Sequence, residues 1–237
     1  MKQTQLRDLW DFDDLDGSER RFRERLAGER SPARRAEVLT QLARVEGLRG
    51  RFDEGDQLLD EAAALEPGPQ VDLERGRLRR SAGDASAALP FFEGAYASAL
   101  EAADDFLAAD AAHMAALASP DPREWTERGL DLARRSKAAE YWLGPLLNNL
   151  GWAQYDAGDH AAALDSFERA LEARERDPDR PYEIEIARYA VAKALLALGR
   201  VDEAIVLLER ALDWASRAGK RDPWFEEALA EAYARRT

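Results

Sequence analysis

Hydrophobic residues recur every three or four positions along nearly the whole chain, and runs of alternating Val, Ile and Thr are missing. This spacing predicts amphipathic helices and no strands. The helical pattern is interrupted at Gly50, Gly83, Gly158 and Gly199, each of which is followed by a polar step and a second amphipathic stretch. We therefore expect an all-α chain of helical hairpins with glycine at the turns.

Small residues mark a repeat in this pattern. The gap between Gly83 and Gly158 holds one further hairpin, in which residues 119–122 replace the glycine turn. The small residues late in the second helix of each hairpin then recur first every 33 or 34 residues and later every 41, at Ala62, Ala95, Gly129, Ala170 and Ala211. Regular spacing of this kind predicts five repeats that pack against their neighbours.

The fourth repeat resembles the tetratricopeptide repeat, a helix-turn-helix unit of about 34 residues. The family's L-G pair and its later alanine and phenylalanine positions are matched by Leu150, Gly151, Ala163, Phe167 and Ala170. Leu147 stands where the family prefers tryptophan, and Gln154 where it prefers tyrosine. The last two repeats resemble the longer subclass found in kinesin light chains. The resemblance implies a right-handed α-solenoid with a concave face.

The expected domains follow from this register. Residues 1–34 form an N-terminal segment and a capping helix, for which Ser18 is the expected N-cap, and residues 223–237 form a C-terminal capping helix. The tetratricopeptide-like array spans residues 35–218, with repeats near 35–68, 69–102, 103–136, 138–178 and 181–218. Gly144-Pro145 either kinks the long helix before Asn148 or marks its start.

Composition narrows the function classes. The chain has 237 residues, 46% of them hydrophobic, no cysteine and a formal net charge of −13. A negative chain without a secretory leader or a long apolar run is expected to be cytoplasmic and to bind neither nucleic acid nor membranes. Abundant arginine and alanine are typical of GC-rich bacterial coding.

The sequence contains no constellation that predicts catalysis. Asp110 stands one helical turn before His113, but no nucleophile motif or phosphate-binding loop accompanies the pair, and His160 lies in a turn. The acidic stretch 11–22 lacks the first and last ligands of a calcium loop. We therefore expect no enzymatic activity, no metal site and no cofactor.

The candidate site is a second row of side chains, displaced by one residue along the helix from the row that packs against the partner helix. The resemblance implies that this second row lines the concave groove, although core packing is an equal alternative for Tyr155. The groove residues expected to bind a peptide are Arg44, Arg77, Arg80, His113, Asn148, Asn149, Trp152, Tyr155, Tyr189 and Lys193. Arginines and asparagine amides suit an extended peptide, with an acidic one favoured.

The function expected from these residues is a protein-protein interaction module that binds a protein or peptide partner. Two alternatives stay open: a homo-oligomeric scaffold, such as a homodimer formed through the terminal helices, and a regulator that senses a peptide or a small molecule. The acidic-aromatic segment LWDFDD, residues 9–14, is itself of the kind that the groove is expected to bind. The sequence leaves open whether it occupies the groove of its own chain or reaches another copy.

Overall fold

The computed structural model describes residues 4–236, which contain helices and turns and no β-strand. The all-α fold of helical hairpins predicted from the sequence is confirmed. The chain divides into two compact units, the first up to Trp125 and the second from Thr126 onward. The boundary falls inside helix α8 (Pro122–Arg135), so each unit is described by itself.

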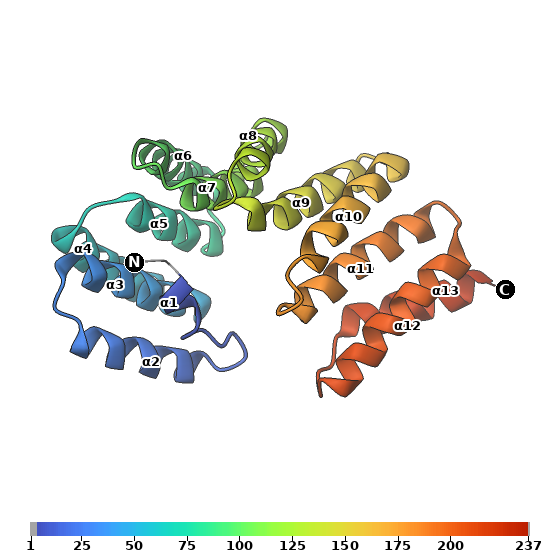
Figure 1. Ribbon diagram of the computed structural model, residues 1–237, viewed down its shortest axis with the longest axis horizontal. Helices are drawn as coiled ribbons and strands as arrows, with labels where there is room; N and C mark the ends of the chain where they lie inside the picture. Colours follow the sequence, from blue (N-terminus) through green and yellow to red (C-terminus); the bar gives the residue numbers. More distant parts are fainter. Residues whose placement is uncertain (1–3, 237) are drawn as a thin grey trace. The chain divides into compact units, whose positions relative to one another are not determined.

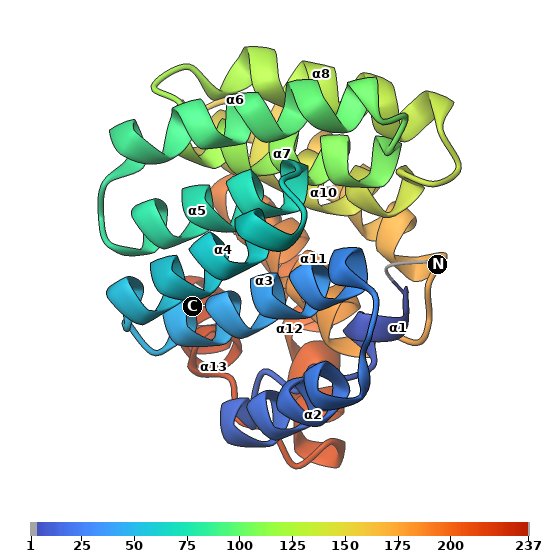
Figure 2. The same ribbon diagram turned by 90° about the vertical axis from the view of Figure 1, so that its left-hand side faces the viewer.

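The first unit is a series of stacked helices. Figure 2 shows α2 to α6 as neighbouring layers, with α2 beside α3 at one end. The bounds of its helices are α1 (Thr4–Arg7), α2 (Leu15–Gly28), α3 (Pro32–Leu48), α4 (Phe52–Leu65), α5 (Pro69–Ser81), α6 (Ala85–Glu101) and α7 (Asp105–Ala118), followed by the start of α8.

The second unit repeats this plan. Figure 1 shows α9 to α13 lying side by side in chain order. After α8 the bounds are the 3₁₀ helix η1 (Glu140–Trp142), α9 (Leu143–Asp156), α10 (His160–Glu175), α11 (Pro181–Ala197), α12 (Val201–Arg217) and α13 (Pro223–Arg236). Gly144 and Pro145 lie in the first turn of α9, so they mark the start of that helix and do not kink it.

Several of the turns contain a residue with a left-handed backbone. Glycine adopts a left-handed conformation after five of the helices, with φ between 64° and 89°, at Gly50, Gly83, Gly158, Gly199 and Gly219. The turn between α6 and α7 is different, because Ala103 takes this conformation with a φ of 55°. An aspartate follows several turns and accepts a backbone N–H of the next helix, as Asp159 does from Ala162.

The N-cap of α2 differs from the sequence expectation. Asp14 caps this helix by accepting a hydrogen bond of 2.8 Å from the backbone N–H of Gly17. Ser18 lies inside α2, where it is fully buried and its hydroxyl donates to the backbone oxygen of Asp11. The carboxylate three residues ahead of Gly17 therefore takes the capping role that the sequence suggested for Ser18.

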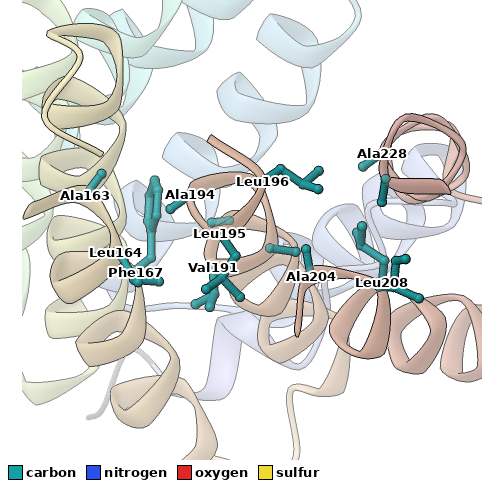
Figure 3. Packing of buried hydrophobic residues seen from close by; sticks show 14 residues of the cluster. Ala163, Leu164, Phe167, Val191, Ala194, Leu195, Leu196, Ala204, Leu208 and Ala228 are labelled. Atoms are coloured by element: carbon teal, nitrogen blue, oxygen red, sulfur yellow. The ribbon is translucent and has the colours of Figure 1, made fainter. Parts of the chain in front are cut away.

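Glycine also sets the spacing within two of the hairpins. A Cβ atom at Gly76 would lie 2.4 Å from the ring of Phe92, and one at Gly151 would lie 2.4 Å from the ring of Phe167. Each phenyl ring therefore fills the space that the missing side chain leaves. In the second unit, Phe167 belongs to a core to which α10, α11, α12 and α13 all contribute side chains (Figure 3).

Candidate functional site

One face of α9 carries polar and aromatic side chains. Asn148, Trp152 and Tyr155 follow one another at helical spacing, and Trp152 and Tyr155 are partly buried. The Trp152 ring packs edge-on against Phe167 at 5.0 Å between ring centroids. The Gly151–Phe167 contact thus brings α10 close to α9, and the same phenyl ring supports the indole.

Aromatic rings continue this face across the second unit. The Trp152 ring lies 5.4 Å from Tyr155 and 6.4 Å from Tyr189, and Tyr189 lies 5.7 Å from Phe225. These residues come from α9, α11 and α13, the first helices of successive hairpins and the terminal helix. We call Trp152, Tyr155, Tyr189 and Phe225 the aromatic row. Phe225 is fully buried, so it anchors the row at α13.

A cation lies beside the aromatic row. The ammonium group of Lys193 donates to Glu231 at 2.8 Å. Burial lowers the pKa of Lys193, but the bond to Glu231 outweighs it, and the net result is a raised pKa. Burial has the opposite effect on Tyr189: it raises the pKa of the phenol, which therefore stays protonated. The face thus presents neutral rings next to the Lys193–Glu231 ion pair.

Two amide groups on α9 have buried atoms without a hydrogen-bond partner. They are the side-chain oxygen Oδ1 of Asn148 and the nitrogen Nδ2 of Asn149. Buried polar atoms are nearly always hydrogen-bonded in folded proteins, because leaving one unpaired costs about 1–3 kcal/mol. One acceptor and one donor within one turn of Trp152 are therefore left unpaired in the fold.

The corresponding face of the first unit is ionic. Arg44 on α3 lies 3.8 Å from Glu74 on α5, Glu74 accepts a hydrogen bond from Arg77, and Arg77 donates to Asp110 on α7 at 2.5 Å. We call these four residues the ionic row. Burial alone would lower the pKa of Arg77, but the adjacent Asp110 and Glu74 raise it. The charge of Arg77 is thus already used within the fold.

The predicted groove residues fall into two groups. In the second unit the structure brings together Trp152, Tyr155, Tyr189 and Lys193, with Asn148 and Asn149 on the same helix as Trp152. In the first unit it connects Arg44 with Arg77 through Glu74. Arg80 is exposed near the end of α5, and His113 is partly buried on α7.

The sequence reasoning missed the acidic members of both faces. Glu74 precedes Arg77 by three residues, a helical spacing that itself indicates an ion pair. Asp110 and Glu231 lie more than thirty residues from their partners Arg77 and Lys193, and no local pattern connects them. In residues 4–236, no cluster of acidic or histidine side chains is arranged to hold a metal ion. No helix in that range is both long and apolar enough to span a membrane.

Sequence comparison identifies repeats in the second unit. Residues 144–177 and 187–217 each match a model of the tetratricopeptide repeat. The first match covers nearly all of α9 and α10, and the second covers most of α11 and α12. No curated protein sequence matches the chain.

Several solved structures share the fold. BtubC (BKLC) from P. vanneervenii has 18% sequence identity and a TM-score of 0.68, over 89% of this chain and 92% of BtubC. A putative kinesin light chain of Podosopora anserina with nearly identical repeats has 17% identity and a TM-score of 0.59, over 81% of this chain and 99% of that protein.

The quorum sensor NprR from B. thuringiensis is also similar. Its apo form has 14% identity and a TM-score of 0.66, over 93% of this chain but only 64% of NprR. NprR in complex with its cognate peptide NprX has a TM-score of 0.60 at 14% identity, over 93% of this chain and 66% of NprR. The chain therefore spans about two thirds of NprR, and these low identities show a shared fold alone.

Proposed function

Because the chain belongs to the tetratricopeptide-repeat family, we propose that it is a protein-interaction module without enzymatic activity and that its second unit binds an extended peptide across α9, α11 and α13. The observation that carries this proposal is the pair of unpartnered amide atoms, Oδ1 of Asn148 and Nδ2 of Asn149, on the helix that carries Trp152 and Tyr155. An extended peptide backbone presents alternating N–H and C=O groups, so it can pair with both atoms once the two partly buried amide side chains turn toward it.

The aromatic row supplies the second part of the binding face. Trp152 and Tyr189 are partly buried, so their rings are already held in place and lose little side-chain freedom when a ligand binds. A flat, rigid ring can cover an apolar side chain of the ligand. We therefore infer that the peptide has an apolar anchor close to the backbone stretch held by the two asparagines.

Lys193 favours an acidic ligand. Its partner Glu231 also pairs with Arg235 at 2.5 Å. When Lys193 turns toward a carboxylate of the ligand, Glu231 therefore keeps a cation. This arrangement lowers the cost of transferring the lysine from an internal carboxylate to an external one. NprR, a structural neighbour solved with its cognate peptide, supports a peptide as the class of partner.

The test uses the full-length chain and a phage-displayed library of random twelve-residue peptides. Selected peptides are synthesised with a fluorescent label, and their affinities are measured by fluorescence polarisation. Asn148→Ala and Trp152→Ala should each weaken binding by about tenfold, as expected for the loss of about 1.4 kcal/mol. Trp224→Ala is the matched aromatic control, because Trp224 is 59% exposed at the start of α13 and outside the aromatic row.

The contrary result is equally clear. If the selected peptides bind the Asn148 and Trp152 variants as tightly as the unmodified chain, the face on α9 is not the binding site. Circular dichroism melting of each variant checks that a loss of binding does not come from unfolding.

A homo-oligomeric scaffold is a second candidate. Val206 on α12 and Trp224 and Tyr233 on α13 are 63%, 59% and 43% exposed, which is unusual for large apolar side chains on adjacent helices. Multi-angle light scattering across a hundredfold range of concentration tests this candidate. A mass of 26.5 kDa at every concentration would rule it out.

A further inference from the structure

The segment before α2 folds back onto α3. Leu6, Leu9 and Trp10 pack against the core of the first unit, and the Trp10 ring meets Phe22 edge-on at 5.1 Å between centroids. The indole N–H of Trp10 donates to the side-chain oxygen of Gln41 at 2.9 Å. The segment is therefore fixed to the same helix that carries Arg44, the first member of the ionic row.

Arg44 holds two aromatic rings of this segment. The Trp10 and Phe12 rings are stacked, with centroids 4.9 Å apart and planes only 7° from parallel. The guanidinium carbon of Arg44 lies 5.8 Å from the Trp10 ring and 5.9 Å from the Phe12 ring. Both distances lie within the range of a cation–π attraction. Gln41 and Arg44 thus form a face that accepts an aromatic pair separated by one residue.

A charged side chain of α2 also contacts the segment. Residues 7–14, which precede α2, contain four aspartates and one arginine. Arg21 on α2 donates to the backbone oxygen of Leu9 at 2.8 Å. An acidic, aromatic segment is therefore held by cations and by a side-chain amide. These contacts are the kind by which a protein surface recognises a separate peptide.

The exposure of Phe12 distinguishes a segment that occupies a binding face from one that only caps the core. A segment that only capped the core would pack its apolar side chains against that core, as Trp10 does with its partly buried ring. Phe12 instead is 61% exposed and is held by its stacking on Trp10 and by the proximity of Arg44. The Phe12 ring therefore interacts mainly with Trp10 and Arg44 and adds little to the core.

We propose that Gln41 and Arg44 form a second peptide-binding face, which the chain's own Trp10-Asp11-Phe12 occupies until a partner displaces it. The partner is a peptide with two aromatic residues separated by one position and flanked by carboxylates. This face lies in the first unit and does not depend on the proposed site at α9. Because the internal segment is tethered, its effective concentration is of millimolar order, and an external peptide competes against it.

The competition gives a quantitative test on the full-length chain. The probe is a labelled synthetic peptide of residues 6–14, LRDLWDFDD, measured by fluorescence polarisation. The variant Trp10→Ala/Phe12→Ala should bind the probe at least about tenfold more tightly than the unmodified chain. The reason is that its own segment no longer occupies the face formed by Gln41 and Arg44. Adding Arg44→Ala should remove this gain, and a probe with alanine at both aromatic positions should not bind.

A second measurement avoids substitution at Trp10, which supports the core. Unlabelled LRDLWDFDD is added to the unmodified chain, and hydrogen exchange is followed by mass spectrometry. Displacement should speed exchange at residues 9–14, including the backbone N–H of Asp11, which now donates to Ser18 at 2.7 Å. Phe12→Ala alone should enlarge the effect, and the alanine-substituted probe should have none.

Three outcomes would overturn the proposal. The first is a folded Trp10→Ala/Phe12→Ala variant that does not bind the probe. The second is unchanged exchange at residues 9–14 with the probe in excess. The third is a concentration-dependent dimer that Trp10→Ala/Phe12→Ala abolishes without any gain in probe binding, which would mean that the segment serves exchange between copies. Trp152→Ala should alter peptide selection at α9 alone, so failure of either site is distinguishable from failure of the other.

Discussion

The phenyl ring of Phe167 lies so close to the backbone of Gly151 that no methyl group fits between them. The close approach of α9 and α10 thus depends on the absence of a side chain at Gly151 and on the large ring of Phe167. The same relationship joins Gly76 to Phe92 in the other unit. Since Trp152 also leans on Phe167, the spacing of this hairpin determines the position of the proposed peptide anchor.

Replacing Gly151 with alanine should therefore destabilise the protein. Alanine at an ordinary helix position would gain about 1 kcal/mol over glycine, but here its Cβ atom must displace a buried ring. We expect a net loss of about 1–3 kcal/mol in the free energy of unfolding, measured by urea denaturation. Gly94→Ala is the matched control, because the nearest atom to its Cβ position is 3.7 Å away and alanine should stabilise that helix. Equal effects at both positions would contradict the packing argument.

The turn at Ala103 offers a stabilising substitution. Ala103 adopts a left-handed backbone, which costs a residue with a side chain about 1–2 kcal/mol, whereas Gly158 occupies the equivalent conformation without strain. Ala103→Gly should raise the melting temperature, because the relief of strain exceeds the added flexibility of the unfolded chain. Gly158→Ala should lower it. A melting temperature that falls for both variants would show that chain flexibility outweighs strain at this turn.

The ionic row should be sensitive to the loss of Arg77. Arg77→Met leaves the buried carboxylates of Glu74 and Asp110 without their shared cation, and we expect a loss of about 3–5 kcal/mol at pH 7.

Urea denaturation at pH 7 measures this effect. The exposed Arg169, which pairs with Asp165 on the surface of α10, provides the control substitution Arg169→Met with little change expected. The combined variant Glu74→Gln/Arg77→Met/Asp110→Asn should recover much of the stability at pH 7. A small loss in Arg77→Met would mean that Arg77 is available to ligands after all.

The Lys193–Glu231 pair should contribute stability between acid and strongly alkaline pH. The bond to Lys193 lowers the pKa of Glu231, so this contribution is present above the unfolded glutamate pKa of about 4.3 and disappears as the pH falls through the lower folded value. The pKa of Lys193 is raised, so the contribution persists up to about pH 10 and is lost as the pH rises through the folded value.

Glu231→Gln isolates this contribution. Because both side chains are partly exposed to water, the difference from the unmodified chain should be only about 0.5 kcal/mol at pH 6 and should vanish near pH 2. Urea denaturation at both pH values gives the free energies, and an NMR titration of the Glu231 carboxyl group gives its pKa directly. An unshifted carboxyl pKa would contradict the pairing.

Features that depend on neighbours in sequence could be predicted without coordinates. The turn glycines and the Gly151 position follow from backbone conformation and helix period, which the local sequence specifies. The stripe from Asn148 to Tyr155 follows from helical geometry alone, and this geometry also placed Tyr189 and Lys193 on the same face.

Features that depend on distant residues could not be predicted. Arg77 was expected in the groove as a cation for a ligand, yet Asp110, 33 residues later, pairs with it. Similarly, the sequence left open whether LWDFDD contacts its own chain or another copy. The hydrogen bond from Trp10 to Gln41 connects residues 31 positions apart within the chain. Such pairings are decided by which helices stack, which no short window of sequence records.

The contrast between the two rows bears on how this protein can change over evolutionary time. Glu74, Arg77 and Asp110 each depend on a charged neighbour, so a substitution at one of them is tolerated only with compensation at another, and these positions should covary. Trp152 and Tyr189 meet through rings that other apolar groups can replace singly. New binding specificities would therefore arise by stepwise mutation of the aromatic row in the second unit. The residues of the ionic row in the first unit would change more slowly.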